Sequence, residues 1–350
     1  MSSEPTVEPG APRRRRWRRF AVLALGNLVV LAVLLVGAEF VYRWLYPDLR
    51  ASIRTFPGQH QNRTNWARSD PDLGWVFSGS GYHTFLRPQK QWTATVNREG
   101  FRSSFDYESR GPKGAAKRVM VLGDSYAFGI YLNDAETFCA LLQERLGPSY
   151  EIYSLAIPGW GLDQMYLAYS KYAPIVDPDV VITVYIDDDV NRVFDAYRWV
   201  EGLNKPSFTL EHGRLGRRTD DRPGVLEALA SRSLMARQLY NRLYRVPMSI
   251  ALSRALFAQL ADETTERRQQ LIPVRYPGKR EIVLRDRPYP YDLSGIFAER
   301  GIPHLDPAAD MLAAGPDAIA RFYFDDDAHP TREGNAFVVR YVVHRAFTRQ

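Results

Sequence analysis

The most constraining feature of this chain is a run of nineteen residues without a charge, from Phe20 to Ala38. As an α-helix it would be roughly 28 Å long, about the thickness of the hydrocarbon core of a bilayer. Six arginines lie within residues 13–19, directly before this run. Basic residues beside a spanning helix stay on the cytoplasmic side. We therefore predict a basic cytoplasmic tail over residues 1–19, a transmembrane anchor over residues 20–38 that lies in the lipid bilayer, and an outward-facing remainder.

A cleaved signal peptide is the alternative interpretation of this segment. Its apolar region would be shorter, and a small-x-small cleavage site would follow it. The best candidate site, Val36-Gly37-Ala38, fits that pattern poorly. Trp44 and Tyr46, a few residues further on, suit a membrane interface. The sequence therefore favours an anchor that is not removed.

The composition argues against several classes of partner. The net charge is +6, which equals the contribution of the six arginines before the anchor, so the rest of the chain is close to neutral. This distribution gives no support to nucleic-acid binding. The single cysteine, Cys139, excludes an intrachain disulfide, and no Cys- and His-rich motif suggests a structural zinc site. We expect no cofactor.

The outward-facing part divides into a lead-in and a larger domain. Residues 47–115 combine turn formers with short alternating runs, which predicts a small strand-containing lead-in. From 116 to 350 the pattern is different, because uniformly apolar strands alternate with amphipathic helices. This alternation indicates an α/β domain with a parallel sheet covered on both faces. The strands are expected at 118–122, 151–157 and 180–186, and the helices at 135–146 and 161–173.

The stretch from about 192 to 290 fits this alternation less well. It contains a hairpin pattern, FTLEHGRL, and a helical amphipathic pattern at 226–244. We predict that it is a cap or insertion in the domain. The alternation resumes with a helix at 291–300, a short strand at 302–305 and a final helix at 331–346.

Polar residues follow the carboxyl ends of the predicted strands, where open parallel sheets bind their ligands. Ser125 comes directly after the first strand, in the sequence Gly-Asp-Ser. At a strand-to-helix turn, the start of the helix favours a developing negative charge. A serine nucleophile also needs a base and a group that orients the base. Asp326 and His329 are three residues apart, so they can face the same way and supply both.

Each of these motifs has a simpler explanation when taken alone. Gly-Asp-Ser after a strand and Asp-x-x-His before a helix are both common helix caps, but their combination in one α/β domain favours catalysis. His304 with Asp306 is a rival pair, although it follows a short strand that resembles a sheet edge. The acidic triplets 187–189 and 325–327 could hold Mg²⁺ or Ca²⁺. Capping explains them better, and we predict no metal site.

Three blocks of the sequence resemble the SGNH, or GDSL, hydrolase superfamily: GDSY, AIPGWGLDQ and DDAHPTREGN. The resemblance covers about residues 117–190 and 291–346. The anchor and the VNREGFR block of the lead-in are similar to a membrane-anchored bacterial subgroup. The resemblance implies a flavodoxin-like three-layer sandwich with five parallel strands. It also implies a single pass through a bacterial inner membrane, with a cytoplasmic N-terminus and a periplasmic catalytic domain.

The resemblance also implies roles for individual residues. The catalytic triad would be Ser125, Asp326 and His329. The oxyanion hole would consist of the backbone N–H groups of Ser125 and Gly159 and an asparagine side chain after the third strand. Asp188 stands where that asparagine is expected, and an ionised carboxylate cannot donate a hydrogen bond.

Three explanations of this departure are open. Burial protonates Asp188 so that it can donate, or Asn191 replaces it as the donor, or the domain is weakly active or inactive. The loss of one oxyanion donor typically lowers the rate on the order of 100- to 1,000-fold.

Two functions of different classes follow from these observations. The first is a serine esterase or O-acyl (acetyl) transferase that works through an acyl-enzyme on Ser125. Its substrate would be an ester or acylated carbohydrate of an envelope or extracellular polysaccharide, as the resemblance to anchored proteins implies. The second is a catalytically weak or inactive SGNH-fold binding or assembly component of polysaccharide machinery, which Asp188 favours.

Overall fold

The computed structural model describes residues 12–46, 66–87, 90–198, 202–218, 225–287 and 291–348. Residue contacts divide the chain into two compact units. The first contains Met1–Phe56 and Pro223–Arg242, and the second contains Pro57–Arg222 and Leu243–Gln350. Most of the predicted cytoplasmic tail, residues 1–11, lies outside the described residues.

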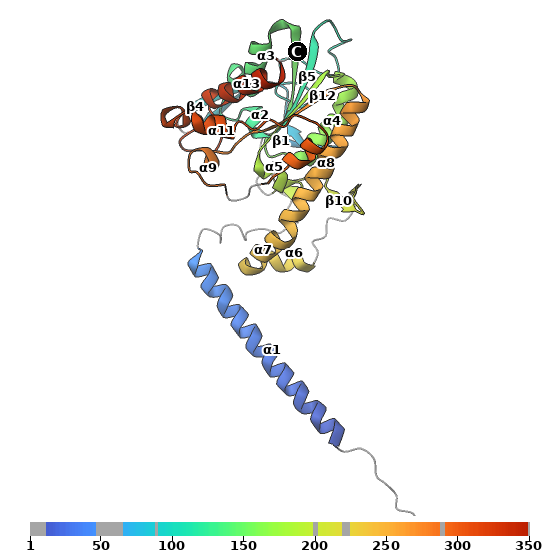
Figure 1. The fold of residues 1–350 in the computed structure, drawn as a ribbon, viewed down its shortest axis with the longest axis vertical. Helices are drawn as coiled ribbons and strands as arrows, with labels where there is room; N and C mark the ends of the chain where they lie inside the picture. The colour runs from blue at the N-terminus through green and yellow to red at the C-terminus, as the bar shows by residue number, and fades with distance from the viewer. Residues whose placement is uncertain are drawn as a thin grey trace, which may run out of the picture. The chain divides into compact units, whose positions relative to one another are not determined.

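The first unit contains a long helix, α1 (Pro12–Leu45), shown in blue in Figure 1. Its segment Trp17–Leu45 is long and apolar enough to cross a membrane, and none of its most apolar window is buried by other residues. The predicted helix over 20–38 is therefore present and continues at both ends. Two short helices, α6 (Val225–Ala230) and α7 (Leu234–Tyr240), belong to the same unit.

The helix predicted at 226–244 is broken where α6 ends and α7 begins. The hydroxyl of Ser233 accepts a hydrogen bond from the N–H of Ala236, so this serine caps a new helix. Ser and Thr favour caps over helix interiors because their side chains can satisfy the free N–H groups of a helix start. After α7 the chain continues through a π-helical turn (Asn241–Arg245) into α8 (Val246–Glu266).

The second unit is built on a parallel sheet with the strand order β12-β7-β5-β6. All three strands predicted from their apolar sequences are present, and their ladders are parallel. From β5 the chain continues to β6 on one side of it and then crosses over to β7 on the other side. The direction in which strands are added therefore reverses between β5 and β7. Ligands of such sheets bind at the carboxyl ends beside this switch point. The strands are β5 (Lys117–Gly123), β6 (Tyr150–Ala156), β7 (Val180–Tyr185) and β12 (Gln270–Arg275).

The fifth strand, expected at 302–305, is reduced to a single parallel bridge between Leu305 and Val274. The N–H of Leu305 donates to the carbonyl of Pro273, and its carbonyl accepts from Arg275. The described sheet therefore has four strands, and this bridge occupies the place of the fifth. The segment is too short to extend the ladder further.

Helices cover both faces of the sheet, which confirms the predicted three-layer α/β sandwich. On one side α3 (Phe138–Leu146) packs against α13 (Arg332–Ala346), and on the other α4 (Leu162–Val176) packs against α8 (Figure 1). The remaining helices are short: α2 (Ser125–Phe128), α5 (Asp187–Arg192), α9 (Lys279–Ile282), α10 (Ser294–Glu299), α11 (Ala308–Ala313) and α12 (Pro316–Ile319).

The stretch at about 192–290 differs from the predicted cap. Both α8 and β12 lie within it, yet they are layers of the α/β domain itself. Pro273 obscured the strand in the sequence, because proline is rare in central strands. The carbonyl of Pro273 accepts from Leu305, on the side of β12 away from β7. The N–H and C=O of one strand residue point to the same side, so the N–H that proline lacks is not needed in the ladder with β7. Smaller hairpins precede these elements: β8 (Tyr197–Arg198) with β9 (Leu203–Asn204), and β10 (Phe208–Glu211) with β11 (Arg214–Arg217).

The lead-in contains the expected strands and packs on the α/β domain. It forms two antiparallel hairpins, β1 (Ala67–Asp70) with β2 (Gly74–Phe77), and β3 (Gly81–Arg87) with β4 (Lys90–Val96). Its buried aromatic residues join the hydrophobic core of the larger domain. Phe77, for example, stacks on Phe128 of α2 with the ring centroids 5.8 Å apart. The lead-in therefore contributes to the surroundings of the strand ends.

Candidate active site

Ser125 begins a single helical turn, α2, directly after strand β5. The side chain of Asp124 accepts a hydrogen bond from the N–H of Tyr126 at 2.9 Å, which caps this turn. A Cβ on Gly123 would lie 2.5 Å from the Cβ of Ala127, so the tight turn requires glycine. The sequence Gly-Asp-Ser is thus explained by a sharp exit from the strand that brings the serine side chain to the sheet's carboxyl edge.

The imidazole of His329 meets the hydroxyl of Ser125. Nε2 of His329 lies 2.9 Å from Oγ of Ser125, although the two residues are 204 positions apart. On the other side of the ring, Nδ1 lies 2.5 Å from Oδ1 of Asp327. The hydroxyl, the imidazole and the carboxylate therefore form one hydrogen-bonded chain, the arrangement used by serine hydrolases.

The carboxylate on His329 belongs to Asp327, whereas the sequence predicted Asp326. That prediction used helical spacing, but residues 325–329 form turns and bends, and α13 begins only at Arg332. In this turn Oδ1 of Asp327 also accepts the backbone N–H of His329 at 2.9 Å. Such a contact to a residue two positions on is characteristic of aspartate in turns. The side chain of Asp326 is exposed.

Two side chains from other parts of the chain hold the loop that carries His329. The hydroxyl of Tyr126 donates to the carbonyl of Ala328 at 2.8 Å and so ties this loop to the turn that carries Ser125. Nζ of Lys279 donates to the carbonyls of Phe324 and Asp325, at 2.6 and 2.8 Å. These hydrogen bonds from Tyr126 and Lys279 therefore help to hold His329 in place relative to Ser125.

Three carboxylates surround the guanidinium of Arg192 next to the turn that carries Ser125. Nη1 lies 3.1 Å from Asp124 and 2.5 Å from Asp189, and Nη2 lies 2.7 Å from Asp188. Burial opposes the charge on Arg192, but the three carboxylates outweigh this effect and raise the pKa of the guanidinium. Burial and the nearby carboxylate of Asp124 raise the pKa of Asp189. One buried cation thus offsets part of the negative charge of this cluster.

Two of the expected oxyanion donors are available. Within the described part of the chain, the backbone N–H groups of Ser125 and Gly159 have no hydrogen-bond acceptor. Gly159 adopts a φ of +83°, a conformation that favours glycine. Buried N–H groups are nearly always paired, so two free ones beside a serine are consistent with a site for an anion.

Asp188, at the position of the third expected donor, does not have the surroundings of a hydrogen-bond donor. The side chain of Asp188 is 52% exposed and pairs with Arg192, which is the environment of an ionised carboxylate. Protonation by burial therefore does not account for this residue. Asn191 directs its side-chain oxygen to Nε of Arg245 at 3.1 Å. Its role as a substitute donor stays a prediction.

The lead-in fixes the loop that contains Gly159. The indole N–H of Trp75, on β2, donates to the carbonyl of Pro158 at 3.1 Å. In return, the indole of Trp160 donates to the carbonyl of Trp75 at 2.9 Å. Both indoles are fully buried. Because these bonds lie on both sides of Gly159, the loop has little freedom to move its N–H group.

The lead-in also holds the end of helix α2, through Arg102 of the VNREGFR block. Nη1 of this buried arginine donates to the carbonyls of Phe128 and Gly129, at 3.0 and 2.8 Å. Nη2 donates to the carbonyl of Leu132 at 2.7 Å, and Nε pairs with Asp134 at 2.8 Å. Burial lowers the pKa of Arg102, and Asp134 opposes that shift. The rigid, planar guanidinium of Arg102 thus hydrogen-bonds to three carbonyls that follow Ser125 in the chain.

Replacement of Arg102 by lysine should therefore lower kcat about 100-fold with a small change in KM. Lysine keeps the charge but carries all its donors on one nitrogen, so it cannot replace the spread of guanidinium nitrogens that binds three carbonyls and Asp134. Small displacements of a reacting group typically cost rate to this extent. Steady-state kinetics on a soluble ester would measure both constants. Arg98→Lys is the matched control, since the side chain of Arg98 is 82% exposed and pairs only with Asp106 among described residues. Equal kinetics for the two variants would contradict the assignment.

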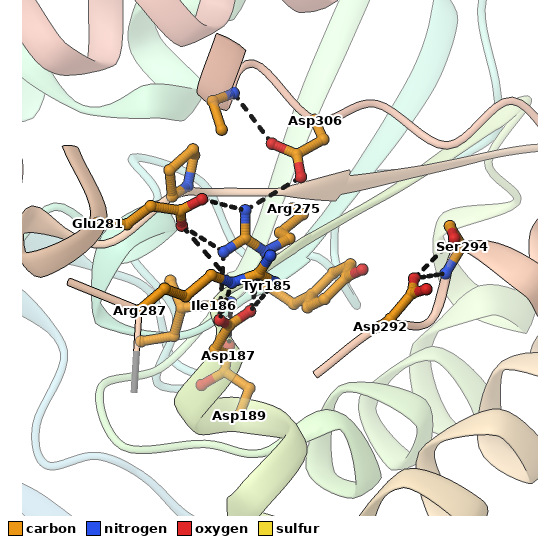
Figure 2. A network of polar contacts seen from close by, with 12 residues as sticks. Tyr185, Ile186, Asp187, Asp189, Arg275, Glu281, Arg287, Asp292, Ser294 and Asp306 are labelled. Carbon is orange, nitrogen blue, oxygen red and sulfur yellow. Dashed lines mark hydrogen bonds and ion pairs between the residues drawn. The ribbon is translucent and has the colours of Figure 1, made fainter. Parts of the chain in front are cut away.

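Asp187, the first residue of the acidic triplet, belongs to a separate network around Arg275 (Figure 2). It lies 2.8 Å from Nε of Arg275 and 2.9 Å from Nε of Arg287. Asp306 also pairs with Arg275, at 3.0 Å, while His304 bonds to the hydroxyl of Tyr185. The side chains of the rival pair, His304 and Asp306, thus bond to different partners, Tyr185 and Arg275. In the described ranges, no three His, Cys, Asp or Glu side chains are grouped to hold a metal ion.

No family model and no curated protein matches this sequence. Solved structures with a similar fold include TesA, with 12% identity, a TM-score of 0.40, and coverage of 65% of this chain and 96% of that one. The acetyl xylan esterase AlAXEase has 14% identity and a TM-score of 0.41, over 66% and 100% of the chains. A lipase/acylhydrolase from Enterococcus faecalis has 14% identity and a TM-score of 0.38, over 67% and 99%. Others are described as GDSL proteins, from Bacteroides thetaiotaomicron and Veillonella parvula, the superfamily that the sequence motifs resemble.

Sequence reasoning missed four residues that the structure places around the serine and histidine: Asp327, Arg192, Arg102 and Lys279. For Arg192 a local signal was present, because it follows Asp188 and Asp189 at the spacing of ion pairs on a helix. Arg102 and Lys279 act through backbone carbonyls of distant segments, and no local pattern indicates such contacts.

Proposed function

We propose that this chain is a serine esterase or O-acyl transferase that works through an acyl-enzyme on Ser125. The observation that carries the proposal is the continuous chain from Oγ of Ser125 through His329 to Asp327, with contacts of 2.9 and 2.5 Å. A carboxylate on Nδ1 keeps the imidazole proton on that nitrogen. The lone pair of Nε2 then faces the serine hydroxyl and can accept its proton.

The reaction follows from this geometry. Oγ of Ser125 attacks the carbonyl carbon of the ester as Nε2 of His329 takes its proton. The N–H groups of Ser125 and Gly159 stabilise the negative oxygen of the tetrahedral intermediate. His329 gives the proton to the leaving alcohol oxygen, the C–O bond breaks, and the acyl group stays on the serine. Water or a sugar hydroxyl then attacks this acyl-enzyme by the same steps in reverse, which yields hydrolysis or transfer.

Arg192 supports an active site despite the aspartate at position 188. Oδ2 of Asp124 lies 3.2 Å from Oγ of Ser125, so an uncompensated carboxylate here would oppose a developing oxyanion. Arg192 contacts Asp124 and Asp188 together and offsets part of their charge. This arrangement favours a catalytic role over the inactive alternative. Without a third donor, the expected rate is modest.

We further propose that the chain spans a bacterial inner membrane once, with a cytoplasmic N-terminus and a periplasmic catalytic domain. The six arginines at the start of α1, before its charge-free segment, support this orientation. A contact of Glu39 supports retention of the helix, because its carboxylate accepts N–H groups of Leu234 and Met235, at 2.7 and 3.1 Å. Cleavage after Ala38 would free this residue from its helix. The proposed substrate class, acylated envelope or extracellular polysaccharide, rests on the sequence resemblance.

Labelling with a fluorophosphonate probe tests the catalytic proposal. The purified full-length protein in detergent should gain one probe mass, and peptide mapping should place it on Ser125. Release of acetate from an acetylated polysaccharide, compared with transfer of a labelled acetyl group to a sugar acceptor, then distinguishes hydrolysis from transfer. A folded protein that takes up no probe would instead support the alternative of a binding or assembly component.

A further inference from the structure

Helices α6 and α7 carry a patch of large apolar side chains at the surface. Val225 is 87% exposed, Leu226 65% and Leu239 60%, and Leu229 and Met235 are also exposed. Single exposed leucines are ordinary. Five such residues on two consecutive short helices form a patch of the kind that marks contact with a membrane or a protein. We refer to residues 225–240 as the α6–α7 pair.

The α6–α7 pair is attached to the end of α1 by hydrogen bonds at the start of α7. The carboxylate of Glu39 accepts the N–H groups of Leu234 and Met235 and the hydroxyl of Ser233, the last at 2.8 Å. Arg43, itself 2.6 Å from Glu39, donates to the carbonyl of Arg232 at 2.8 Å. A carboxylate at the N–H groups of a helix start is a favourable arrangement, because these groups have no partner within the helix.

The position of Glu39 sets the depth of this attachment. It is the first charged residue after the charge-free segment that ends at Ala38, so it lies where the helix leaves the hydrocarbon. A helix whose first turn binds Glu39 therefore begins in the interfacial layer. At that level apolar side chains reach the acyl chains and basic side chains reach the headgroups.

The charge of this segment also suits a lipid surface. Residues 225–242 contain three arginines, at 232, 237 and 242, and one acidic residue, Glu227. Basic residues close to a membrane surface are attracted to anionic headgroups. The combination of apolar and basic side chains is that of amphipathic elements that lie in the plane of a membrane.

We propose that the α6–α7 pair is a second membrane-contact element, which lies on the outer surface of the bilayer that α1 spans. Its exposed apolar side chains insert into the interfacial region, and Glu39 holds it at that depth. The inference rests on the membrane anchoring proposed above and goes beyond it, since a single spanning helix requires no such element. The partner is a phospholipid surface.

Single-cysteine labelling of the full-length chain in phospholipid vesicles tests this proposal. In a Cys139→Ala background, an environment-sensitive fluorophore is placed at Leu226→Cys or Leu239→Cys. Leu31→Cys, in the middle of α1, serves as the control for insertion, and Leu86→Cys, a leucine that is 85% exposed on β3, as the control for exposure to water. The vesicles carry a doxyl quencher either near the headgroup or near the end of the acyl chain.

The expected result is a shift to shorter wavelength at positions 226 and 239, with stronger quenching by the shallow doxyl group than by the deep one. Position 31 should prefer the deep quencher, and position 86 should respond to neither. Glu39→Gln should weaken quenching at position 239 while position 31 keeps its quenching. Retained fluorophosphonate labelling of each variant shows that the domain is folded.

The outcomes separate the two proposals. If position 31 is not quenched, the anchoring proposal and this inference both fail. If position 31 is quenched but positions 226 and 239 behave like position 86, only this inference is overturned. A shift to shorter wavelength that neither lipid quencher affects would show that protein, for example a second copy of the chain, covers the patch, which also overturns it.

Discussion

Replacement of Ser125 by alanine is expected to lower kcat/KM for an ester on the order of 10⁴- to 10⁶-fold. The substitution removes the oxygen on which the proposed acyl-enzyme forms. It should leave the fold unchanged, since Oγ contacts only Asp124 and His329 among the described residues. Hydrolysis of a chromogenic acetate ester by the purified protein measures the loss, and thermal unfolding checks the fold.

A second serine of the chain provides the matched control for this substitution. Ser253, on α8, is fully buried, and its hydroxyl has no hydrogen-bond partner within the described residues. Ser253→Ala removes the same atom from an equally buried position, so activity should stay within a few-fold of wild type. If Ser125→Ala retained activity comparable to this control, the hydrolysis would come from elsewhere and the acyl-enzyme mechanism would be rejected.

The second large effect is expected at Asp327, where substitution by asparagine should lower kcat about 10⁴-fold. An asparagine amide can donate to Nδ1 of His329, which places the imidazole proton on Nε2. That nitrogen then faces Ser125 with a hydrogen and cannot accept the hydroxyl proton. Steady-state kinetics across a range of pH would measure the effect.

The neighbouring aspartate makes this prediction sharp. Asp326→Asn changes the same chemical group one residue away, on an exposed side chain, and should alter kcat only a few-fold. Helical spacing predicts the opposite order, with the large loss at Asp326. A larger loss for Asp326→Asn than for Asp327→Asn would return the orienting role to the residue three positions before the histidine.

The lead-in takes part in the site at two places that no sequence pattern connects. Arg102 binds the carbonyls at the end of the serine helix, and Trp75 exchanges hydrogen bonds with the loop around Gly159. Both contacts go to backbone groups beside the residues proposed to bind the reacting carbonyl. The lead-in is therefore a supporting part of the site, and its removal should affect catalysis as well as folding.

Much of the fold could be predicted because it depends on local periodicity. The apolar strands around 118–122, 151–157 and 180–186 are buried on both faces, so their sequences differ clearly from the amphipathic helices between them. Strand β12 was not predicted, because it contains Pro273. This proline fits the strand because it faces Leu305 and not β7, which the sequence does not show. The break between α6 and α7 was missed for a related reason, since a serine cap competes with a helical pattern that otherwise continues.

The pattern of residues alone was enough to predict a helix able to span a membrane, an α/β sandwich, and a serine and a histidine at the carboxyl edge of its sheet. These features follow from charge-free length, periodicity and strand ends, each of which lies within a short window. The contact of Asp327 with His329 and the pairing of Arg192 with three aspartates are visible only in the folded chain. The same is true of the hydrogen bonds from Arg102 to the end of helix α2. Contacts of this kind join turns and segments distant in the chain, and their geometry depends on how those segments pack.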